Sequence, residues 1–468
     1  MKRMILLLLV LSLLLSGCGA AKPVPGGPEK LTADKILFYP PEGWKDRQGT
    51  LLPLKDVEAA WTQTLFPRSH YYDELFQGDG ERLLHVLDYC FANGYAGFSV
   101  RSGTLELDLS AQQFRALRFV YRIDDSKVLA HRGDGDGAYD TVRLEYREGH
   151  QEDTMPYFVQ GLEAVREIVK QAPKDLNDYE TACWVMDYLA GHVQYGDRDR
   201  YYFTDGHQLY DALVGGTTLC SGYADAMYYL CNALGVDCLC VYGLCISQTK
   251  DGGLDDHLWN LVRMDGDWYY CDPTWNATTG PTPVPRFFGL SEQTLYLLNG
   301  DRRTGEYSDD TMIPASGQSY NPTAHWNDTP EGALKSWLWF AGYAAQEPVY
   351  LIAALDLVPE DALLEAPDAE GYLQSSISYA DFSREIAKFM TEDCFTAWFT
   401  KVYREKDGKL SLRPDRSGGP VWALQSLREA GDAWRAVLLS SEGDQREAEL
   451  RFELQDGRYR VESFDFLP

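Results

Sequence analysis

Apolar residues recur every three or four positions between residues 156 and 195, and this spacing predicts two amphipathic helices. The same spacing further along the chain predicts a third helix that begins at or near Cys220. We expect Gly235 to end this helix, because glycine commonly follows the last helical turn. Residues 236–246 then alternate and are rich in β-branched and Cys residues, which predicts a strand.

A different pattern follows and predicts a β-hairpin. Two apolar runs flank the dipeptide Asp265-Gly266, which suits a two-residue turn between antiparallel strands. With these two residues at the centre of the turn, Asp272 faces Trp259 on the opposite strand. His257 is two residues from Trp259 and points to the same face. We therefore expect His257 and Asp272 to be diagonal neighbours, about 7–8 Å apart and within reach of long side chains.

Residues 34–155 are expected to form a small N-terminal α+β domain. An apolar stripe between residues 83 and 91 predicts a helix. Short alternating runs predict strands at 104–110, 117–124 and 141–147. The segment HRGDGDGAYD spaces its acidic residues as a calcium loop does, at positions 134, 136 and 140. It lacks the Gly and the closing Glu of an EF-hand, so we predict a hairpin turn there.

Residues 330–468 are expected to form a separate C-terminal α+β accessory domain, which leaves 156–329 as the central domain. Helical patterns come first, at 331–345 and 378–390. Alternating patterns follow and predict strands around 434–440, 446–454 and 458–466. The dipeptide Asp456-Gly457 suits a tight turn between the last two strands. Helices followed by an antiparallel meander are typical of an α+β layer fold.

The beginning of the chain carries targeting features. Lys2 and Arg3 precede an apolar run of eleven residues, which is too short to span a hydrocarbon core of about 30 Å and is typical of a signal peptide. The residues up to Cys18 resemble a bacterial lipobox, in which the Cys is lipidated and becomes the new N-terminus. We expect a lipoprotein signal peptide at 1–17 and a lipidated Cys18 with a Pro- and Gly-rich tether at 18–33. The alternative is an ordinary cleaved signal; either way the protein is expected to be extracytoplasmic.

The net charge of the chain excludes some classes of binding partner. The chain of 468 residues has 43 Lys and Arg against 71 Asp and Glu, a formal net charge of −28. This acidity argues against binding to nucleic acid and against adhesion to anionic lipid through a basic patch. Contact with the membrane is therefore expected through the N-terminal lipid alone, and the sequence does not indicate an oligomeric state.

Ten cysteines are present, and nine remain after Cys18. Because nine is odd, at least one thiol stays unpaired. Four of them lie close together, at positions 231, 238, 240 and 245, but they lack the paired C-x2-C spacing of a structural zinc site. We expect these four to be small buried side chains, and we expect no metal site.

Cys220 differs from the other cysteines because it lies at the predicted start of a helix. The partial positive charge and the N–H groups of a helix N-terminus favour a thiolate. The same N–H groups can stabilise the oxyanion of an acyl-transfer intermediate. His257 and Asp272 together form a base with an orienting acid, which is the arrangement that activates a nucleophile.

Four further residues are weaker candidates for the site. Trp259 and Trp275 flank the predicted His–Asp pair, where they could wall a substrate channel or simply pack in the core. Gln208 and Tyr210 precede Cys220 by twelve and ten residues, and either side chain could complete an oxyanion hole.

The motifs in this region resemble those of the transglutaminase-like family, which belongs to the papain-like cysteine enzymes. They are LCSGYADAM at 219–227, DHLWNLVRMDGDWYYCDPTWN at 256–276, and the VQYGD end of the preceding helix at 193–197. The resemblance covers roughly residues 156–300. It implies an α+β papain-like core with nucleophile Cys220, base His257 and acidic partner Asp272. The neighbours of Cys220 and the residue after His257 depart from the usual family choices, which affects the expected substrate preference more than the chemistry.

The resemblance also implies a function. A Cys-His-Asp triad would cleave a peptide or glutamine-type amide through a thioester, without a metal or organic cofactor. We expect a peptidase or amidase ahead of a protein-crosslinking transglutaminase, acting on a peptide or protein, with cell-wall peptides among the candidates. The alternative is a non-catalytic surface lipoprotein that uses the fold to bind peptides or wall components. Residues 378–466 weakly resemble cystatin-like modules of other bacterial lipoproteins, which would make the C-terminal domain a binding module.

Overall fold

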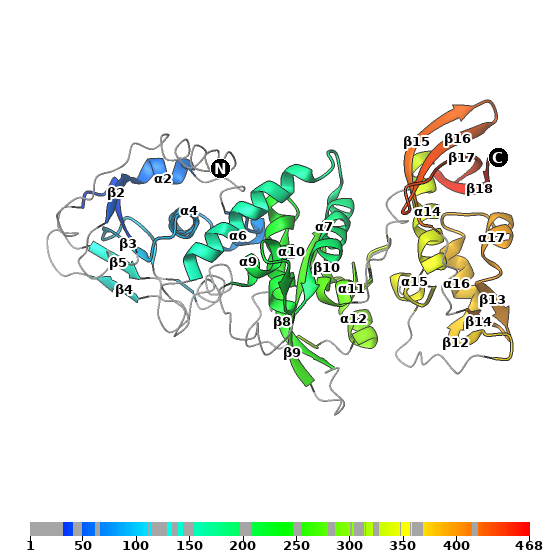
Figure 1. Ribbon diagram of the computed structural model, residues 1–468, viewed down its shortest axis with the longest axis horizontal. Helices are drawn as coiled ribbons and strands as arrows, with labels where there is room; N and C mark the ends of the chain where they lie inside the picture. The colour runs from blue at the N-terminus through cyan, green and yellow to red at the C-terminus, as the bar shows by residue number, and fades with distance from the viewer. Residues whose placement is uncertain are drawn as a thin grey trace, which may run out of the picture. The chain divides into compact units, whose positions relative to one another are not determined.

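A computed structural model gives the fold of the chain in two compact units (Figure 1). The first unit contains residues up to 172 together with 196–239, and the second contains 173–195 together with 240–468. The domain boundaries expected after residues 155 and 329 stay a prediction. The structure describes residues 31–40, 49–60, 66–107, 109–110, 113, 129–132, 139–143, 154–196, 207–246, 254–278, 286–299, 302–303, 313, 315–321, 327–346, 348–355, 357, 368–413 and 420–468.

The first unit combines a five-stranded antiparallel sheet with helices. The strand order is β2-β1-β3-β5-β4. The strands are β1 (Lys35–Tyr39), β2 (Thr50–Pro53), β3 (Gly97–Arg101), β4 (Leu129–Arg132) and β5 (Tyr139–Arg143), with a short β7 (Thr217–Thr218) elsewhere in the unit. The helices are α2 (Leu54–Ala60), α3 (His70–Leu75), α4 (Asp79–Ala92), α6 (Thr154–Ile168), α9 (Gln208–Leu213) and α10 (Cys220–Ala233), and a 3₁₀ turn covers Val169–Gln171.

Aromatic side chains join the N-terminal elements of this unit to α10. The ring of Phe66, which is fully buried, lies 6.1 Å from that of Phe158 on α6 and 6.0 Å from that of Tyr229 on α10. Phe91 on α4 completes the group at 6.4 Å from Phe66. Asp237, just after α10, accepts a hydrogen bond of 2.7 Å from the backbone N–H of His70, the first residue of α3. Phe66 and Phe91, from the N-terminal elements, therefore share a buried aromatic group with α6 and α10.

The second unit contains a four-stranded sheet and a group of helices near it in sequence. The strand order is β10-β9-β8-β11, and the division between the units falls inside β8. The strands are β8 (Cys238–Ile246), β9 (Leu254–Met264), β10 (Asp267–Cys271) and β11 (Arg302–Arg303), with a short β6 (Gln194–Tyr195) elsewhere in the unit. The helices of this part are α7 (Asp178–His192), α11 (Pro273–Thr278) and α12 (Glu292–Asn299).

The C-terminal part of the second unit has two more antiparallel sheets, ordered β12-β14-β13 and β15-β16-β17-β18. The strands are β12 (Leu373–Ser378), β13 (Tyr403–Lys406), β14 (Lys409–Leu412), β15 (Trp422–Ala430), β16 (Ala433–Ser440), β17 (Gln445–Gln455) and β18 (Arg458–Phe466). The helices are α14 (Pro330–Gln346), α15 (Pro348–Ala354), α16 (Tyr379–Ile386) and α17 (Glu392–Phe399).

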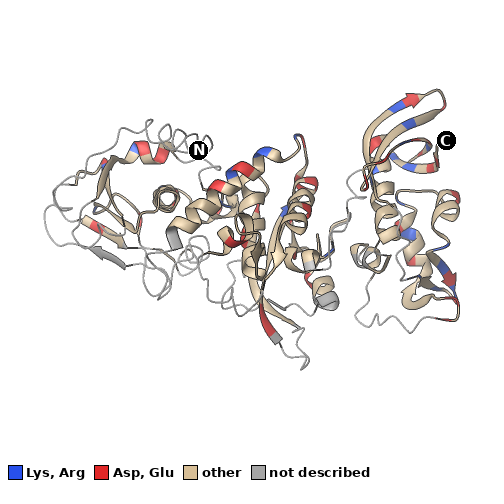
Figure 2. Ribbon diagram, viewed as in Figure 1, with Lys and Arg blue, Asp and Glu red and all other residues tan. Residues whose placement is uncertain are grey.

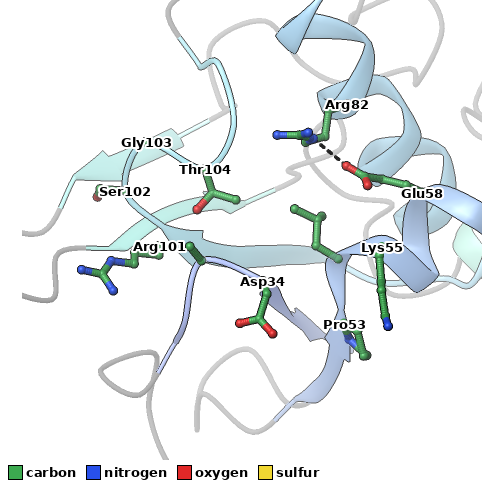
Figure 3. Close-up of a pocket in the computed structure, with 11 residues that line it drawn as sticks. Asp34, Pro53, Lys55, Glu58, Arg82, Arg101, Ser102, Gly103 and Thr104 are labelled. Carbon is green, nitrogen blue, oxygen red and sulfur yellow. Dashed lines mark ion pairs between the residues drawn. The ribbon is translucent and has the colours of Figure 1, made fainter.

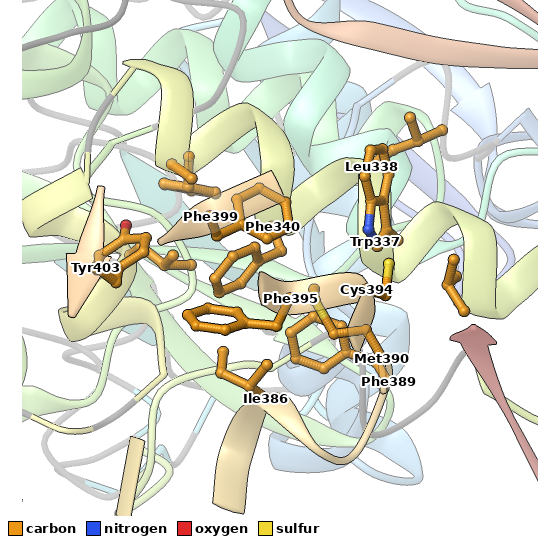
Figure 4. Packing of buried hydrophobic residues seen from close by; sticks show 14 of the residues in the cluster. Trp337, Leu338, Phe340, Ile386, Phe389, Met390, Cys394, Phe395, Phe399 and Tyr403 are labelled. Carbon is orange, nitrogen blue, oxygen red and sulfur yellow. The ribbon is translucent and has the colours of Figure 1, made fainter. Parts of the chain in front are cut away.

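Aromatic rings fill the core of this part (Figure 4). Phe340 of α14 lies 4.7 Å from Phe399 and 5.4 Å from Phe389, measured between ring centroids. One turn earlier on α14, Trp337 stacks on Phe464 of β18 at 4.0 Å. These contacts pack α14 and α17 against the four-stranded meander.

Most of the elements expected from the sequence are present. The two helices within 156–195, the helix beginning at Cys220, the strand that follows it, and the helix and three strands expected near the C-terminus are confirmed. The stripe at 83–91 lies in α4, and β4 and β5 pair across the predicted hairpin turn. The helix expected at 378–390 ends earlier, at Ile386.

The strand expected at 104–110 is wrong for the residues that the structure describes there. The strand β3 ends at Arg101, and the N–H of Thr104 donates to the carbonyl of Arg101 at 3.0 Å, which makes a turn. Gly103 in this turn has φ of 80°, a conformation that a continuing strand does not allow. The run at 117–124, residues 1–17, Cys18, most of the tether and the acidic positions 134 and 136 lie outside the described residues.

Charged residues are distributed unevenly over the elements (Figure 2). Figure 2 shows Glu and Arg along α6 and Asp and Glu along α7, whereas α10 has Asp225 as its one charged residue and is buried from Gly222 to Asn232. Among the described residues, no helix is long and apolar enough to cross a membrane.

The first unit also contains a cavity of about 540 Å³ beside β1, β2 and β3 (Figure 3). Charged side chains line it, and two of them, Glu58 and Arg82, form an ion pair at 2.6 Å across one wall. None of the candidate site residues lines this cavity.

Candidate active site

Cys220 is the first residue of α10, as the sequence predicted. The residue before it, Leu219, has extended backbone angles and makes no side-chain hydrogen bond to the helix. The first turn of α10 therefore begins without a side-chain cap, which suits a helix end that is to receive an anion. The Cys220 side chain is partly exposed. This position allows a reagent or substrate to reach the thiol.

Two residues after Cys220, a glycine is required by close packing. A Cβ atom on Gly222 would lie 2.0 Å from Oγ1 and 2.7 Å from Cβ of Thr218. Thr218 is buried, and it belongs to the extended residues that lead into α10. Gly222 thus lets the chain before Cys220 pass directly over the first helical turn.

His257 and Asp272 form a buried pair on the hairpin of β9 and β10. The observed register, with Met264 opposite Asp267 and Asn260 opposite Cys271, is the one expected from the sequence. The imidazole Nε2 lies 2.6 Å from Asp272 Oδ2. His257 is 4% exposed and Asp272 is fully buried, so water screens their interaction little. The predicted diagonal placement of the two residues is confirmed.

The remaining hydrogen-bonding groups of Asp272 are also used. Its second carboxylate oxygen, Oδ1, accepts the backbone N–H of Trp275 at 3.0 Å. Its carbonyl accepts the N–H of Asn276 at 3.1 Å, and its own N–H donates to the carbonyl of Phe287 at 2.7 Å. These bonds fix the orientation of the carboxylate at the start of α11. Phe287 was not foreseen from the sequence, because no motif or periodicity distinguishes it.

Both tryptophans expected near the pair contact the imidazole. The indole of Trp259 lies 5.6 Å from the His257 ring at an interplanar angle of 29°, and that of Trp275 lies 6.4 Å away at 76°. Trp259 is 1% exposed, which is the burial of a core residue, whereas Trp275 is partly exposed. Of the two, Trp275 has the exposure that a channel wall needs.

Gln208 and Tyr210 lie on α9, which packs against α10 in the first unit. Gln208 is the first residue of α9, and the ring of Tyr210 contacts that of Tyr157 edge-on at 4.9 Å. Their part in an oxyanion hole stays a prediction.

No disulfide joins any two of the nine cysteines that the structure describes. Burial raises the pKa of Cys90 and of Cys183 well above the ordinary value. Burial also raises the pKa of Cys394, to about 12. Of the four clustered cysteines, Cys240 is partly exposed and the other three are buried, as expected for small core side chains. Within the described ranges, no group of three or more His, Cys, Asp or Glu side chains could hold a metal ion.

The candidate nucleophile belongs to the first unit, and the His257–Asp272 pair belongs to the second. The thiol and the base–acid pair are therefore each held by contacts within their own unit. The position of the thiol depends on the packing of α10 and Gly222, and that of the base–acid pair depends on the hairpin and on the start of α11.

Comparisons with known proteins bear on this region of the chain. The sequence profile of the transglutaminase-like superfamily matches residues 164–273. Kyphoscoliosis peptidase of Mus musculus and that of Homo sapiens are each 28% identical to the chain over 148 residues, which cover 29% of this chain and 21% of each relative. The chain thus spans about a fifth of the length of these curated relatives.

A crystal structure offers a more distant likeness. It is that of a proposed cysteine protease from Cytophaga hutchinsonii, which is 11% identical to this chain. The superposition has a TM-score of 0.21 and covers 32% of this chain and 62% of that one.

Cys220, His257 and Asp272 all lie inside the range that the superfamily profile matches.

Proposed function

Because residues 164–273 form a domain of the transglutaminase-like superfamily, we propose that this chain is a cysteine-dependent enzyme that cleaves or transfers amide acyl groups. Cys220 is the nucleophile, His257 the base and Asp272 the acid that orients the base. The observation that carries the proposal is the buried contact of 2.6 Å between His257 Nε2 and Asp272 Oδ2, inside the matched range.

The geometry of this pair supports one tautomer of the base. An ionised carboxylate can only accept a hydrogen bond, so Nε2 of His257 carries the proton that it donates to Asp272. The proton acceptor is then Nδ1, which takes the proton of the Cys220 thiol in the proposed reaction. The stacked indole of Trp259 and the bond to Asp272 hold the ring in this orientation.

The reaction follows from these roles. The thiolate of Cys220 attacks the carbonyl carbon of a peptide or of a glutamine side chain, and backbone N–H groups at the start of α10 hold the oxyanion. The imidazolium of His257 protonates the leaving amine, which leaves a thioester on Cys220. Water then releases the acid in a hydrolase, or a second amine takes the acyl group in a transferase. We propose that hydrolysis is the main reaction. None of these steps uses a cofactor.

Location is a further part of the proposal and rests on the sequence of residues 1–33. Lipidation of Cys18 would tether the enzyme to the outer face of a cell membrane and bring it to wall peptides or neighbouring surface proteins. Incorporation of a labelled fatty acid into the full-length chain, lost in Cys18→Ala, tests the anchor independently of activity.

The proposed chemistry is tested by alkylating the protein with limiting iodoacetamide near pH 6 and mapping each cysteine by mass spectrometry. Ordinary thiols, with a pKa of about 8.5, are almost wholly protonated at that pH. We expect Cys220 to react fastest, and His257→Ala to slow its labelling at least about tenfold. His192→Ala is the matched control, since His192 is exposed on α7 of the same unit and stacks on Tyr188.

Turnover is then measured with a library of fluorogenic peptides. Cys220→Ala should abolish cleavage, whereas Cys240→Ala, which removes another partly exposed thiol, should leave it unchanged. Two results together would refute the enzymatic proposal: Cys220 is labelled at the rate of the other cysteines, and peptide binding survives Cys220→Ala. They would favour the alternative, a non-catalytic protein that binds peptides.

A further inference from the structure

A short segment, residues 286–290, lies against the end of β10 and the residue that follows it. Tyr270 and Leu290 exchange two backbone hydrogen bonds, each of 2.9 Å. Closer to the site, the N–H of Asp272 donates to the carbonyl of Phe287 at 2.7 Å. The segment therefore continues the pairing of the hairpin up to the acidic residue itself.

The backbone of Phe287 is in an unfavourable conformation for a bulky residue. Its φ is 49°, in the left-handed region that mainly glycine and asparagine adopt. Its side chain is nevertheless buried, with 4% of its surface exposed. A conformation of this kind persists where the surrounding contacts outweigh its cost, and such residues cluster at functional sites.

Phe287 contacts Asp272 directly and also contacts Trp275, which binds the Asp272 carboxylate. Its carbonyl receives the backbone N–H of Asp272, and its ring lies 6.0 Å from the ring of Trp275. The backbone N–H of Trp275 in turn holds Oδ1 of the Asp272 carboxylate at 3.0 Å. One residue thus supports both the main chain of Asp272 and the group that binds its second oxygen, which leaves Oδ2 aimed at His257.

Hydrogen bonds on both sides of Phe287 also hold the segment 286–290 in place. The N–H of Arg286 donates to Asn276 Oδ1 at 2.8 Å, and the N–H of Tyr320 donates to the carbonyl of Gly289 at 2.6 Å. The main chain on both sides of Phe287 is thereby fixed, so the left-handed turn cannot relax without breaking these bonds.

We propose that Phe287 is a positioning residue that sets the orientation of the Asp272 carboxylate toward His257, an inference that rests on the catalytic role proposed for that pair. Phe287 lies beyond the matched range 164–273, so the superfamily profile assigns it no role. Loss of its ring lets Trp275 move, and the bond from Trp275 to Asp272 Oδ1 then lengthens. The imidazole of His257 can still act as a base, but the carboxylate no longer fixes the orientation of its ring.

The first test measures the His257–Asp272 bond directly, without relying on activity. In protein labelled with ¹⁵N-histidine, the ring N–H signal of His257 is identified by its loss in His257→Gln. We expect Phe287→Ala to speed solvent exchange of this proton about tenfold or more, because a displaced carboxylate no longer protects it. Should Phe287→Ala fold poorly, Phe287→Gly removes the same ring while accepting the left-handed backbone.

The neighbouring Phe288 provides the matched control. Its ring is buried to a similar degree, but it packs on Tyr179 at 5.3 Å and not on Trp275. Phe288→Ala should destabilise the segment comparably and change the exchange of the His257 ring proton less than about threefold, as expected for a residue without a role at the site. Equal effects of the two substitutions on this proton would overturn the proposal.

A second test uses turnover in a double-mutant cycle. Phe287→Ala should lower kcat about tenfold to a hundredfold with little change in KM, since it misplaces a catalytic group and not the substrate. In an Asp272→Asn background the same substitution should cost less than about twofold, because the residue acts through the carboxylate. A full loss in that background would refute the positioning role. If the wild-type chain shows no turnover but the proton result holds, the catalytic proposal fails and the positioning of Asp272 by Phe287 stands.

Discussion

Replacing Gly222 by alanine should weaken the helix that carries Cys220, although the same change stabilises most helices. An ordinary Gly→Ala substitution within a helix gains up to about 1 kcal/mol, because alanine has the higher helix propensity. At Gly222 the added Cβ would lie 2.0 Å from Oγ1 and 2.7 Å from both Cβ and Cγ2 of Thr218. Rotation about χ1 of Thr218 can move Oγ1 and Cγ2 but not its Cβ. The chain before Cys220 must therefore shift.

The magnitude follows from these two opposing terms. Overpacking of a filled site costs about 1–3 kcal/mol, and the helix gain of up to about 1 kcal/mol offsets part of it. We expect a net destabilisation of about 1–2 kcal/mol, which corresponds to a 5–30-fold change in a local opening equilibrium. The effect should appear as faster amide hydrogen exchange in α10. Labelling of Cys220 should also slow, because the shift occurs in the first turn of its helix.

Amide hydrogen exchange measured by mass spectrometry gives the exchange rate of each helix separately. Exchange in α10 can therefore be compared with exchange in α7, which belongs to the other unit. Gly191→Ala is the control, because Gly191 is on α7 and a Cβ added there would meet no atom within 4 Å, so exchange in α7 should slow or stay unchanged. Thr218→Gly in the Gly222→Ala background removes all three clashing atoms and should restore protection of α10. Slower exchange of α10 in Gly222→Ala alone would refute the close-packing argument.

Three further outcomes are expected. At pH 8, iodoacetamide should leave Cys394 unmodified in the folded protein, because burial raises its pKa to about 12; rapid labelling would show that its site opens. Phe287→Gly should be more stable than Phe287→Ala by up to about 1 kcal/mol in chemical denaturation, since only alanine keeps the left-handed strain; the reverse order would contradict the observed φ. The N–H of Tyr372 and the ammonium of Lys406 lower the pKa of Asp368 from 3.8 to about 2, so its stabilisation is complete above pH 3.8 and disappears as the pH falls through 2. Asp368→Asn should therefore lower the thermal midpoint at pH 5 and leave it almost unchanged at pH 2, and an equal shift at both values would argue against this sign.

Local patterns were sufficient to predict the two halves of the candidate site. The helical spacing after Cys220 and the Asp265-Gly266 turn are signals carried by neighbouring residues, and both φ values at that turn, 50° and 94°, are positive as a tight hairpin requires. Once the turn fixes the register, the diagonal relation of His257 and Asp272 follows from strand geometry alone. The sequence therefore predicted the bond between them without a three-dimensional template.

Contacts between distant segments could not be predicted in the same way. The grouping of Phe66 with Tyr229 joins residues far apart in the chain, and nothing in either local pattern indicates the other. Phe287 belongs to the same class, because its proposed importance comes from a backbone angle and from contacts with Asp272 and Trp275, which lie well before it in the chain. The short helix α17 and the strand β15 were not predicted from the sequence; α17 lies against β18, and β15 lies beside α14, which local patterns do not indicate.

The range that matches the transglutaminase-like superfamily contains all three candidate catalytic residues but not all of the residues that fix them. Phe66 and Phe158, which pack on Tyr229 of the Cys220 helix, precede residue 164, and Phe287, which holds the main chain of Asp272, follows residue 273. A fragment limited to 164–273 would expose the buried face of α10 and would leave the N–H of Asp272 without its acceptor. Both losses act on the geometry of the candidate catalytic groups and not only on overall stability. The extent of the site is therefore set by these flanking contacts, and its chemistry has to be measured in a chain that keeps both flanks.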